Sequence, residues 1–216
     1  MPEAIARKVH EAFSHYPTRI YPKGQILVFA DENPDHIFYI VKGRVRKYDV
    51  SYRGEEVVIN VFKPPAFFPM SWALNRMPNK FFYKTEVETE LHIVPTDAAK
   101  QFLQDNPDVT LDLLSRIYSG LEGMYGRLVH LMSGTARSRL IYELIIDCRR
   151  FGKQQQDGSY LVNSTESDIA ARSGLSRETV SRTISDLKKQ GWVDVEGHRI
   201  IVPDISKLES ALGVEV

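Results

Sequence analysis

The sequence predicts an α+β protein with three successive parts: a β-rich N-terminal half, a long central helix, and a helical C-terminal domain with a β-hairpin. Three observations lead to this prediction. Short β-rich runs separated by turn residues fill positions 20–94. A heptad pattern of apolar residues then extends over about 108–132. Finally, two short helical patterns joined at Gly174 precede a compact hairpin.

The composition is that of a globular protein without a global charge. The chain has 216 residues, of which 43% are hydrophobic, and its formal net charge is zero. Zero net charge argues mildly against a non-specific nucleic-acid binder, although charge can still be concentrated locally. No apolar run approaches the roughly 20 residues of a membrane-spanning helix, and the charged N-terminus lacks the apolar core of a secretory signal. We therefore expect a cytoplasmic protein with no membrane partner.

The N-terminal half is predicted to form a short helix at 3–15, followed by a β-roll. The predicted strands are 25–29, 37–41, 45–50, 57–62, 81–87 and 91–94. Gly24, Gly43 and Gly54 mark tight turns between them. Short strands at regular spacing are typical of an all-β barrel or roll.

A helix at 96–106, closed by Pro107, and a longer helix at 108–132 are predicted next. The long helix has an a/d heptad pattern, which is typical of a dimer seam supported by other contacts and also occurs in ordinary core helices. The predicted seam residues are Leu114, Ile117, Leu121, Met124, Leu128 and Leu131. Gly120, Gly123 and Gly126 fall away from this seam, and we expect the β-roll to pack closely on them. Ser133-Gly134 predicts a break and a hinge, after which Thr135 caps a new helix that ends at Gly152.

The stretch at 165–190 is predicted to form two short helices joined by a tight turn. Ser164 or Thr165 is the expected N-cap of the first helix, and Gly174 ends it in a left-handed conformation. Ser176 caps the second helix without a full capping box. Its core-facing residues recur at three- to four-residue spacing: Val180, Ile184 and Leu187.

Hydrogen-bonding side chains occupy the other face of this second helix, near its N-terminus. Arginine can bond guanine and glutamate can accept from the cytosine amino group, whereas hydroxyls suit phosphates. The predicted DNA-binding residues are Thr165, Ser176, Arg177, Glu178, Thr179, Ser181 and Arg182. A solvated helix face is the structural alternative. The hairpin predicted at 192–203 favours DNA binding, because it completes a winged helix-turn-helix.

The same residues resemble a known family. The run S-R-E-T-V-S-R at 176–182, then L-K-K-Q-G-W-V and a hairpin ending I-I-V-P-D, is similar to the DNA-binding domain of the Crp/Fnr superfamily. The runs Y-P-K-G-Q-I-L, I-F-Y-I-V-K-G-R-V-R and Y-R-G-E-E-V-V-I resemble its cyclic-nucleotide-binding-like β-roll, of jelly-roll type.

The resemblance implies a bacterial, homodimeric transcription regulator. Its domains would be a β-roll sensor at 1–107, a dimerisation helix and hinge at 108–134, and a winged helix-turn-helix at 135–216. The helix at 176–190 would read palindromic double-stranded DNA with a half-site like TGTGA. RNA polymerase is the implied further partner if the protein is an activator.

The stretch at 63–83 departs from the pattern of family members that bind cyclic AMP. The Gly-Glu and Arg-Ser elements are absent, and no glycine occurs between Glu55 and Ser119 to let a phosphate approach the backbone. Cyclic AMP is therefore not expected. Aromatic residues stand there instead, and they form either the core of the roll or a pocket for an apolar or aromatic effector. The candidate pocket residues are Phe67, Phe68, Trp72, Arg76 and Phe82, with Arg76 or Lys80 available for an anionic group.

The sequence predicts no metal, cofactor or catalytic site. A single cysteine, Cys148, cannot hold an iron–sulfur cluster, and its apolar helix favours a structural thiol over a sensor. A haem ligand at His36 or His92 stays open beside the more common structural histidine. No G-x-S-x-G, H-E-x-x-H or Walker motif occurs, so we predict that the protein is not an enzyme. The alternative function is a small-molecule-binding or enzymatic module whose helical C-terminus serves only for protein interaction.

Overall fold

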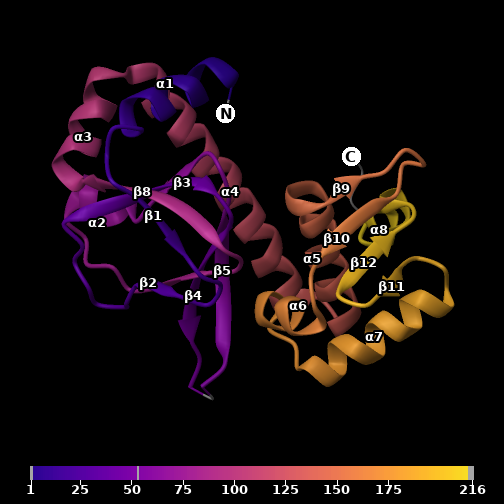
Figure 1. Ribbon diagram of the computed structural model, residues 1–216. Coiled ribbons are helices and arrows are strands. Elements are labelled where there is room, and N and C mark those ends of the chain that lie inside the picture. Colours follow the sequence, from indigo (N-terminus) through magenta and orange to yellow (C-terminus); the bar gives the residue numbers. More distant parts are fainter. Residues whose placement is uncertain (1, 53, 214–216) are drawn as a thin grey trace. The chain divides into compact units, whose positions relative to one another are not determined.

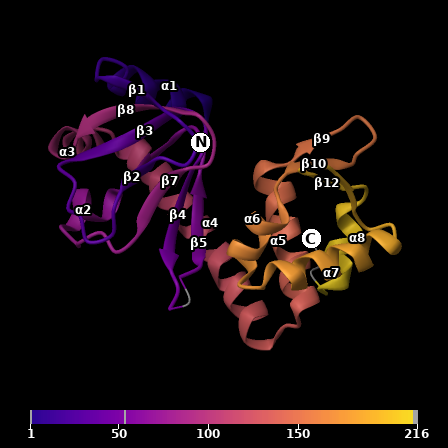
Figure 2. The same cartoon turned by 60° about the horizontal axis from the view of Figure 1, so that its bottom comes forward.

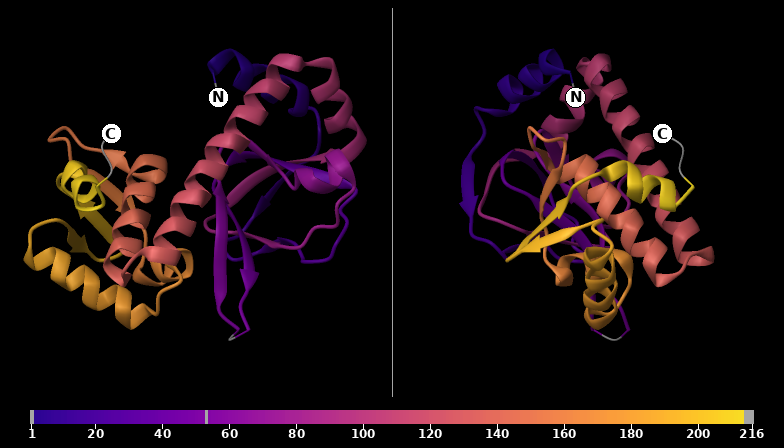
Figure 3. Two further views of the ribbon diagram at one scale, coloured as in Figure 1. Left: turned by 180° about the vertical axis from the view of Figure 1, so that it is seen from behind. Right: turned by 90° about the vertical axis from the view of Figure 1, so that its right-hand side faces the viewer.

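The computed structural model describes residues 2–52 and 54–213 and divides into two compact units, Met1–Ile117 and Tyr118–Val216 (Figure 1). The boundary falls inside α4 (Pro107–Ser133), which Figure 3 shows as one continuous helix. Its first turns pack in the core of the first unit, through Val109 and Leu113. The three-part division predicted from the sequence, with boundaries after 107 and 134, stays a prediction.

Two four-stranded antiparallel sheets build the β-roll of the first unit (Figures 1 and 2). One sheet has the order β1-β8-β3-β6 and the other β2-β7-β4-β5. The strands are β1 (Thr18–Tyr21), β2 (Ile26–Val28), β3 (His36–Lys42), β4 (Val45–Val50), β5 (Glu56–Phe62), β6 (Ala66–Phe68), β7 (Phe82–Thr85) and β8 (Thr89–Pro95). All six predicted strands are therefore present, and the predicted roll is confirmed.

Three short elements of this unit were missed from the sequence: β1, β6 and α2 (Met70–Asn75). Strand β6 has only three residues and lies between Pro65 and Pro69, so the sequence shows no strand pattern there. It forms because the central strand β3 pairs with it, with Tyr39 opposite Phe67. Strand β1 is mostly exposed and lacks apolar alternation, so only its pairing with β8 defines it.

Two clusters of buried residues hold the first unit together. One lies between the β1-β8-β3-β6 sheet and the helices α1 (Glu3–Phe13) and α3 (Thr96–Asp105), with Phe13 at its centre. There the Phe13 ring meets the rings of Tyr39, Phe67 and Phe102 at 5.6, 6.2 and 5.0 Å. The other cluster fills the interior between the two sheets.

Gly43 closes the turn between β3 and β4 at a position that excludes any other residue. Its φ is +102°, and a Cβ there would lie 2.7 Å from the Cα of Thr89. Because both the backbone conformation and the space require glycine, this turn fixes how β3 leads into β4.

Helix α5 (Ala136–Phe151), capped by Thr135 as predicted, folds back along the second half of α4. The neighbour of Gly126 is the phenol of Tyr142 from α5, with which a Cβ at Gly126 would collide. Tyr142 also donates a hydrogen bond to the carbonyl of Gly123, at 3.2 Å. The expectation that the β-roll packs on this glycine stripe was therefore wrong at Gly126, because the break at Ser133-Gly134 returns α5 to that face.

In the described part of the second unit, up to residue 213, five helices or helix segments combine with a small sheet of order β11-β12-β10-β9. Besides α5 and the end of α4 it contains α6 (Glu166–Ser173), α7 (Arg177–Lys189), α8 (Ile205–Ala211), β9 (Lys153–Gln154), β10 (Tyr160–Asn163), β11 (Asp194–Glu196) and β12 (Arg199–Val202). One hydrophobic core joins these elements, with Leu144 of α5 and Leu208 of α8 fully buried in it. The core holds α6 and α7 in a fixed relation to the hairpin.

Candidate DNA-binding interface

Helix α6 begins with a complete capping box. The hydroxyl of Thr165 accepts a hydrogen bond from the backbone N–H of Asp168, and the Asp168 carboxylate accepts one from the backbone N–H of Thr165, both at 3.1 Å. Of the two predicted N-caps, Thr165 is therefore confirmed. The spacing T-x-x-D was the signal in the sequence, and aspartate here replaces the more common glutamate. Gly174 ends α6 with φ +65°, as predicted.

Helix α7 has one buried and one exposed face, as its sequence predicts. Ser176 is the N-cap and accepts a hydrogen bond from the backbone N–H of Thr179, at 3.3 Å. The predicted core residues Val180, Ile184 and Leu187 are all buried. They lock the helix onto the core of the second unit, so the opposite face is held outward.

The exposed face places charged side chains at the N-terminal end of α7. Arg177, Glu178 and Arg182 are all exposed, and the Arg182 Nε donates to the carbonyl of Glu178 at 3.4 Å. Hydrogen bonds from its own backbone N–H and from Ser176 hold the pKa of the Glu178 carboxyl below its usual range. Two cations and an ionised carboxylate therefore stand together where a helix would meet base edges.

The last turn of α7 is tied to the hairpin formed by β11 and β12. Lys188 Nζ lies 2.6 Å from the Asp194 carboxylate on β11, and the backbone N–H of Trp192 donates to the carbonyl of Leu187 at 3.0 Å. The hairpin thus follows α7 directly and forms the predicted wing.

A hollow of about 370 Å³ opens between the start of α6, α7 and the wing. Its lining includes Thr165, Ser167, Arg177 and His198. The hydroxyl of Thr165 also donates a hydrogen bond to the Asp168 carboxylate at 2.7 Å, and the predicted DNA-binding role of Thr165 stays a prediction. Sequence reasoning did not identify His198, because its place beside α6 depends on how the wing folds back.

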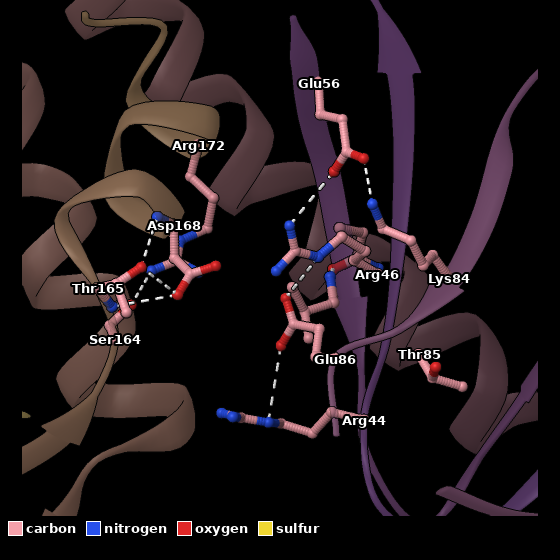
Figure 4. A network of polar contacts seen from close by, with 12 residues as sticks. Arg44, Arg46, Glu56, Lys84, Thr85, Glu86, Ser164, Thr165, Asp168 and Arg172 are labelled. Atoms are coloured by element: carbon pink, nitrogen blue, oxygen red, sulfur yellow. Dashed lines mark hydrogen bonds and ion pairs between the residues drawn. The ribbon is translucent and has the colours of Figure 1, made fainter. Parts of the chain in front are cut away.

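A buried ion pair between Asp147 of α5 and Arg172 of α6 joins these two helices. Figure 4 shows Arg172 close to Ser164. The Arg172 guanidinium lies 2.5 Å from the Asp147 carboxylate and also donates to the Ser164 hydroxyl. The side chains of Arg172 and Asp147 are only 6% and 1% exposed. One oxygen of Asp147 and the Nε of Arg172 have no partner among the described residues. This pair positions α6 without being part of the exposed face.

The stability of the second unit is expected to depend on the ionisation of Asp147. Burial raises the pKa of its carboxyl to about 6, and the neighbouring Arg172 offsets only part of that effect. Because the folded pKa exceeds the unfolded one, this contribution is present at low pH and is lost as pH rises through 4 to 6.5, by about 3 kcal/mol. Urea unfolding of wild type and Asp147→Asn across this range measures the difference. Parallel stability profiles for the two proteins would contradict the assignment.

The predicted dimer seam lies on α4 and is largely exposed in the single chain. Leu114, Ile117, Met124, Leu128 and Leu131 are 44–50% exposed, whereas Leu121 is half-buried. Exposed apolar residues also occupy the heptad e positions, at Leu111, Tyr118, Tyr125 and Met132. The apolar stripe is therefore wider than the a/d pattern predicted. An apolar surface of this extent is typical of a protein–protein interface.

The candidate effector residues lie in different places in the first unit. Phe68 is in the interior of the roll, stacked on Tyr83 at 5.0 Å, whereas its neighbour Phe67 points to the opposite side, under α1. Phe82 stacks on Tyr48 at 5.2 Å. Trp72 lies on α2 and Arg76 directly follows that helix. The guanidinium carbon of Arg76 is 5.6 Å from the centre of the Trp72 ring. The structure does not bring these five residues around one cavity, and their role as an effector pocket stays a prediction.

Cys148 is buried in α5, and burial raises the pKa of its thiol to about 12. A thiol with so high a pKa is unreactive at neutral pH, which supports the structural interpretation.

Within the described residues, no group of three or more histidine, cysteine, aspartate or glutamate side chains could hold a metal ion. No helix in the same part of the chain is both long and apolar enough to cross a membrane.

Comparisons with known proteins agree with both units. Residues 18–106 match the family described as the cyclic nucleotide-binding domain, and residues 138–211 match the Crp-like helix-turn-helix domain. A CRP-like cAMP-activated global transcriptional regulator from Mycobacterium tuberculosis is 25% identical over 190 residues, covering 87% of this chain and 84% of the relative. A global nitrogen regulator from Synechocystis is 24% identical over 205 residues, covering 92% and 90%.

The fold has solved counterparts as well. A CRP/FNR family transcriptional regulator from Thermus thermophilus superposes with a TM-score of 0.73 at 20% identity, covering 91% of this chain and 98% of that one. These relatives are transcription regulators, and the alternative of an enzymatic module is not favoured. With a β-roll that matches the cyclic nucleotide-binding domain family, a long helix and a winged helix-turn-helix in this order, the chain belongs to the Crp/Fnr family of transcription regulators.

Proposed function

We propose that this regulator binds palindromic double-stranded DNA as a homodimer, with α7 of each protomer in the major groove. The observation that carries the proposal is the division of α7 into two faces. Three core residues hold one face, while Arg177, Glu178 and Arg182 are exposed on the other. In such a dimer the two recognition helices lie about 34 Å apart, one turn of DNA.

A mobility-shift titration on a palindromic promoter fragment tests this proposal. Excess non-specific DNA separates sequence-specific binding from general attraction to phosphates, because only the latter is lost to the competitor. We expect a shifted complex that survives the competitor. A complex that vanishes in proportion to added non-specific DNA would contradict the proposal.

The exposed residues of α7 have separable roles in this proposal. Arg177 and Arg182 bond guanine, while Glu178 accepts from cytosine or orients an arginine. Ser176 and Thr165 cap α7 and α6, so they hold two helix N-termini in place, where backbone N–H groups suit phosphates. Thr179 and Ser181, on the first turns of α7, are assigned to the DNA backbone.

Arg182→Ala is expected to weaken binding to the preferred site by about 1–3 kcal/mol and to relax the base preference at one position of each half-site. The loss has this form because a bidentate arginine contact discriminates one base pair. Mobility shifts on a set of single-base operator variants measure it. A uniform loss across all variants would instead make Arg182 a phosphate contact.

Further parts of the proposal concern the rest of the chain. The exposed stripe of α4 forms the dimer seam, and the β-roll binds an effector other than cyclic AMP, because the elements that hold its ribose and phosphate are absent. We place the protein in the cytoplasm, without enzymatic activity, and with RNA polymerase as a partner if it activates transcription.

A further inference from the structure

We propose that the buried ion pair between Asp147 and Arg172 holds the start of α6 where it meets the DNA backbone, and that the pair does not stabilise the second unit. This inference deepens the proposed binding of palindromic DNA and rests on it. Both residues are positioning residues, because they act on DNA through the placement of α6. Neither was among the DNA-binding residues predicted from the sequence.

Apolar packing alone defines the orientation of α6 poorly. All eight residues of this helix are described, and the two that are buried are Ile169 and Ser173. Only Ile169 has an apolar side chain, while Ala170 packs against the same core and is half-buried. Hydrophobic contact is non-directional, so one buried apolar residue does not fix the direction of a two-turn helix. A polar contact with defined geometry is needed for that.

Arg172 provides this contact and joins α5 to both ends of α6. It lies in the last turn of α6, and its Nη2 donates a hydrogen bond to the Asp147 carboxylate of α5 at 2.5 Å. The same nitrogen donates to the hydroxyl of Ser164, which directly precedes the N-cap Thr165 (Figure 4). Because the guanidinium is planar and its donors have a fixed arrangement, it holds these three parts of the chain in one geometry.

The start of α6 is the part of this helix that is placed to meet DNA. Thr165 and Ser167 line the hollow of about 370 Å³ in the DNA-binding face. Arg177 of α7 and His198 of the wing line the same hollow. Backbone N–H groups at a helix N-terminus suit phosphate oxygens. A displaced α6 would therefore lose a phosphate contact, while the core residues of α7 would keep that helix in place.

The ion pair is poorly satisfied, which argues against a role in stability. One oxygen of Asp147 and the Nε of Arg172 are buried without a partner among the described residues. Burial raises the pKa of the Asp147 carboxyl to about 6, although the neighbouring Arg172 lowers it, and Glu143 adds to the increase. The desolvation of this carboxylate thus exceeds what its partner offsets. Replacing such a pair by apolar residues is often neutral or stabilising.

The double variant Asp147→Leu/Arg172→Met tests the proposal in the full chain, because it replaces both charges by apolar side chains. We expect it to melt at or above the temperature of the wild type. In mobility shifts on a palindromic fragment we expect about tenfold weaker binding. The plot of log affinity against log salt concentration should also be shallower by about 1 for each protomer, since one phosphate contact is lost. A purely structural pair would lower the melting temperature and leave the salt dependence unchanged.

Ser164→Ala is a second test that keeps the ion pair and removes only its link to the start of α6. It is expected to weaken DNA binding by about threefold, because one hydrogen bond contributes on this scale. This variant does not depend on how the double variant folds. Wild-type DNA affinity in Ser164→Ala would overturn the proposal.

Arg149→Met/Glu209→Leu is the matched control. This ion pair joins α5 to α8 at 2.7 Å and includes no residue of α6 or α7. Its removal is expected to leave the DNA affinity and the salt dependence as in the wild type. The proposal is overturned if Asp147→Leu/Arg172→Met melts clearly below the wild type, or if it binds DNA with wild-type affinity and salt dependence. A wild type without sequence-specific binding would instead contradict the proposed DNA binding, and this inference with it.

Discussion

Replacing Leu121 and Leu128 by glutamate is expected to separate the dimer and to weaken binding to a palindromic site by roughly 10²–10⁴-fold. Both residues occupy heptad a positions of α4, and Leu128 is 50% exposed in the single chain. Glutamate at two facing seam positions would place four like charges in an apolar contact, which opposes association. A monomer then contacts one half-site and loses the gain from linking two recognition helices.

Light scattering measures the mass in solution, and mobility shifts on a whole and a half palindrome measure the DNA affinity. Ser115→Glu/Ser119→Glu is the matched control, because it adds the same charges to exposed α4 positions outside the a/d seam. The control is expected to remain dimeric with wild-type affinity. Dimers that persist in the leucine double variant would place the interface elsewhere on the chain.

Replacing Arg127 by methionine is expected to lower the free energy of unfolding of the second unit by about 3–5 kcal/mol. Arg127 of α4 donates two hydrogen bonds to the Glu143 carboxylate of α5, at 2.5 and 3.0 Å, and Glu143 is only 2% exposed. Without the guanidinium, a buried carboxylate would be left uncompensated. Removing both partners, in Arg127→Met/Glu143→Leu, is expected to cost far less, because no buried charge then remains.

Urea unfolding in a Trp72→Phe background reports on this unit, since Trp192 is then the remaining tryptophan. Lys189→Met provides the control. Its ion pair with Asp186 spans 3.6 Å between side chains 75% and 60% exposed, so its loss should change stability by less than about 1 kcal/mol. A double variant as unstable as Arg127→Met alone would show that packing, not the unpaired charge, causes the loss.

Local sequence patterns were sufficient for the elements that build the DNA-binding face. The hydroxyl caps at Thr165 and Ser176, the left-handed glycine at Gly174 and the apolar spacing of α7 all depend on residues a few positions apart. These effects act within one helical turn, so the sequence displays them directly. In the first unit, β1, β6 and α2 were missed, because they have weak local signals and form through pairing or packing with distant segments. In the second unit, β9 and α8 were missed as well.

For the candidate effector residues of the β-roll, local sequence patterns were not sufficient. Phe67 and Phe68 are adjacent in the sequence and were grouped as one pocket, yet strand alternation points them to opposite sides of a sheet. Arg76 and Lys80, the predicted anion ligands, each lie beside a carboxylate, Asp97 and Asp31, which the sequence did not show. Sequence can nominate charged side chains, but it does not show which of them are already neutralised.

The sequence alone therefore determined the family, the order of elements and the face of α7 that is exposed, because caps, turns and apolar periods are short-range properties. Only the tertiary structure decided which charges are paired and which are buried. Arg127 of α4 pairs with Glu143 of α5, and Asp147 of α5 pairs with Arg172 of α6. These ion pairs form because folding brings together residues that are many positions apart in the sequence. Burial then raises the energetic cost of leaving any of these charges without a partner.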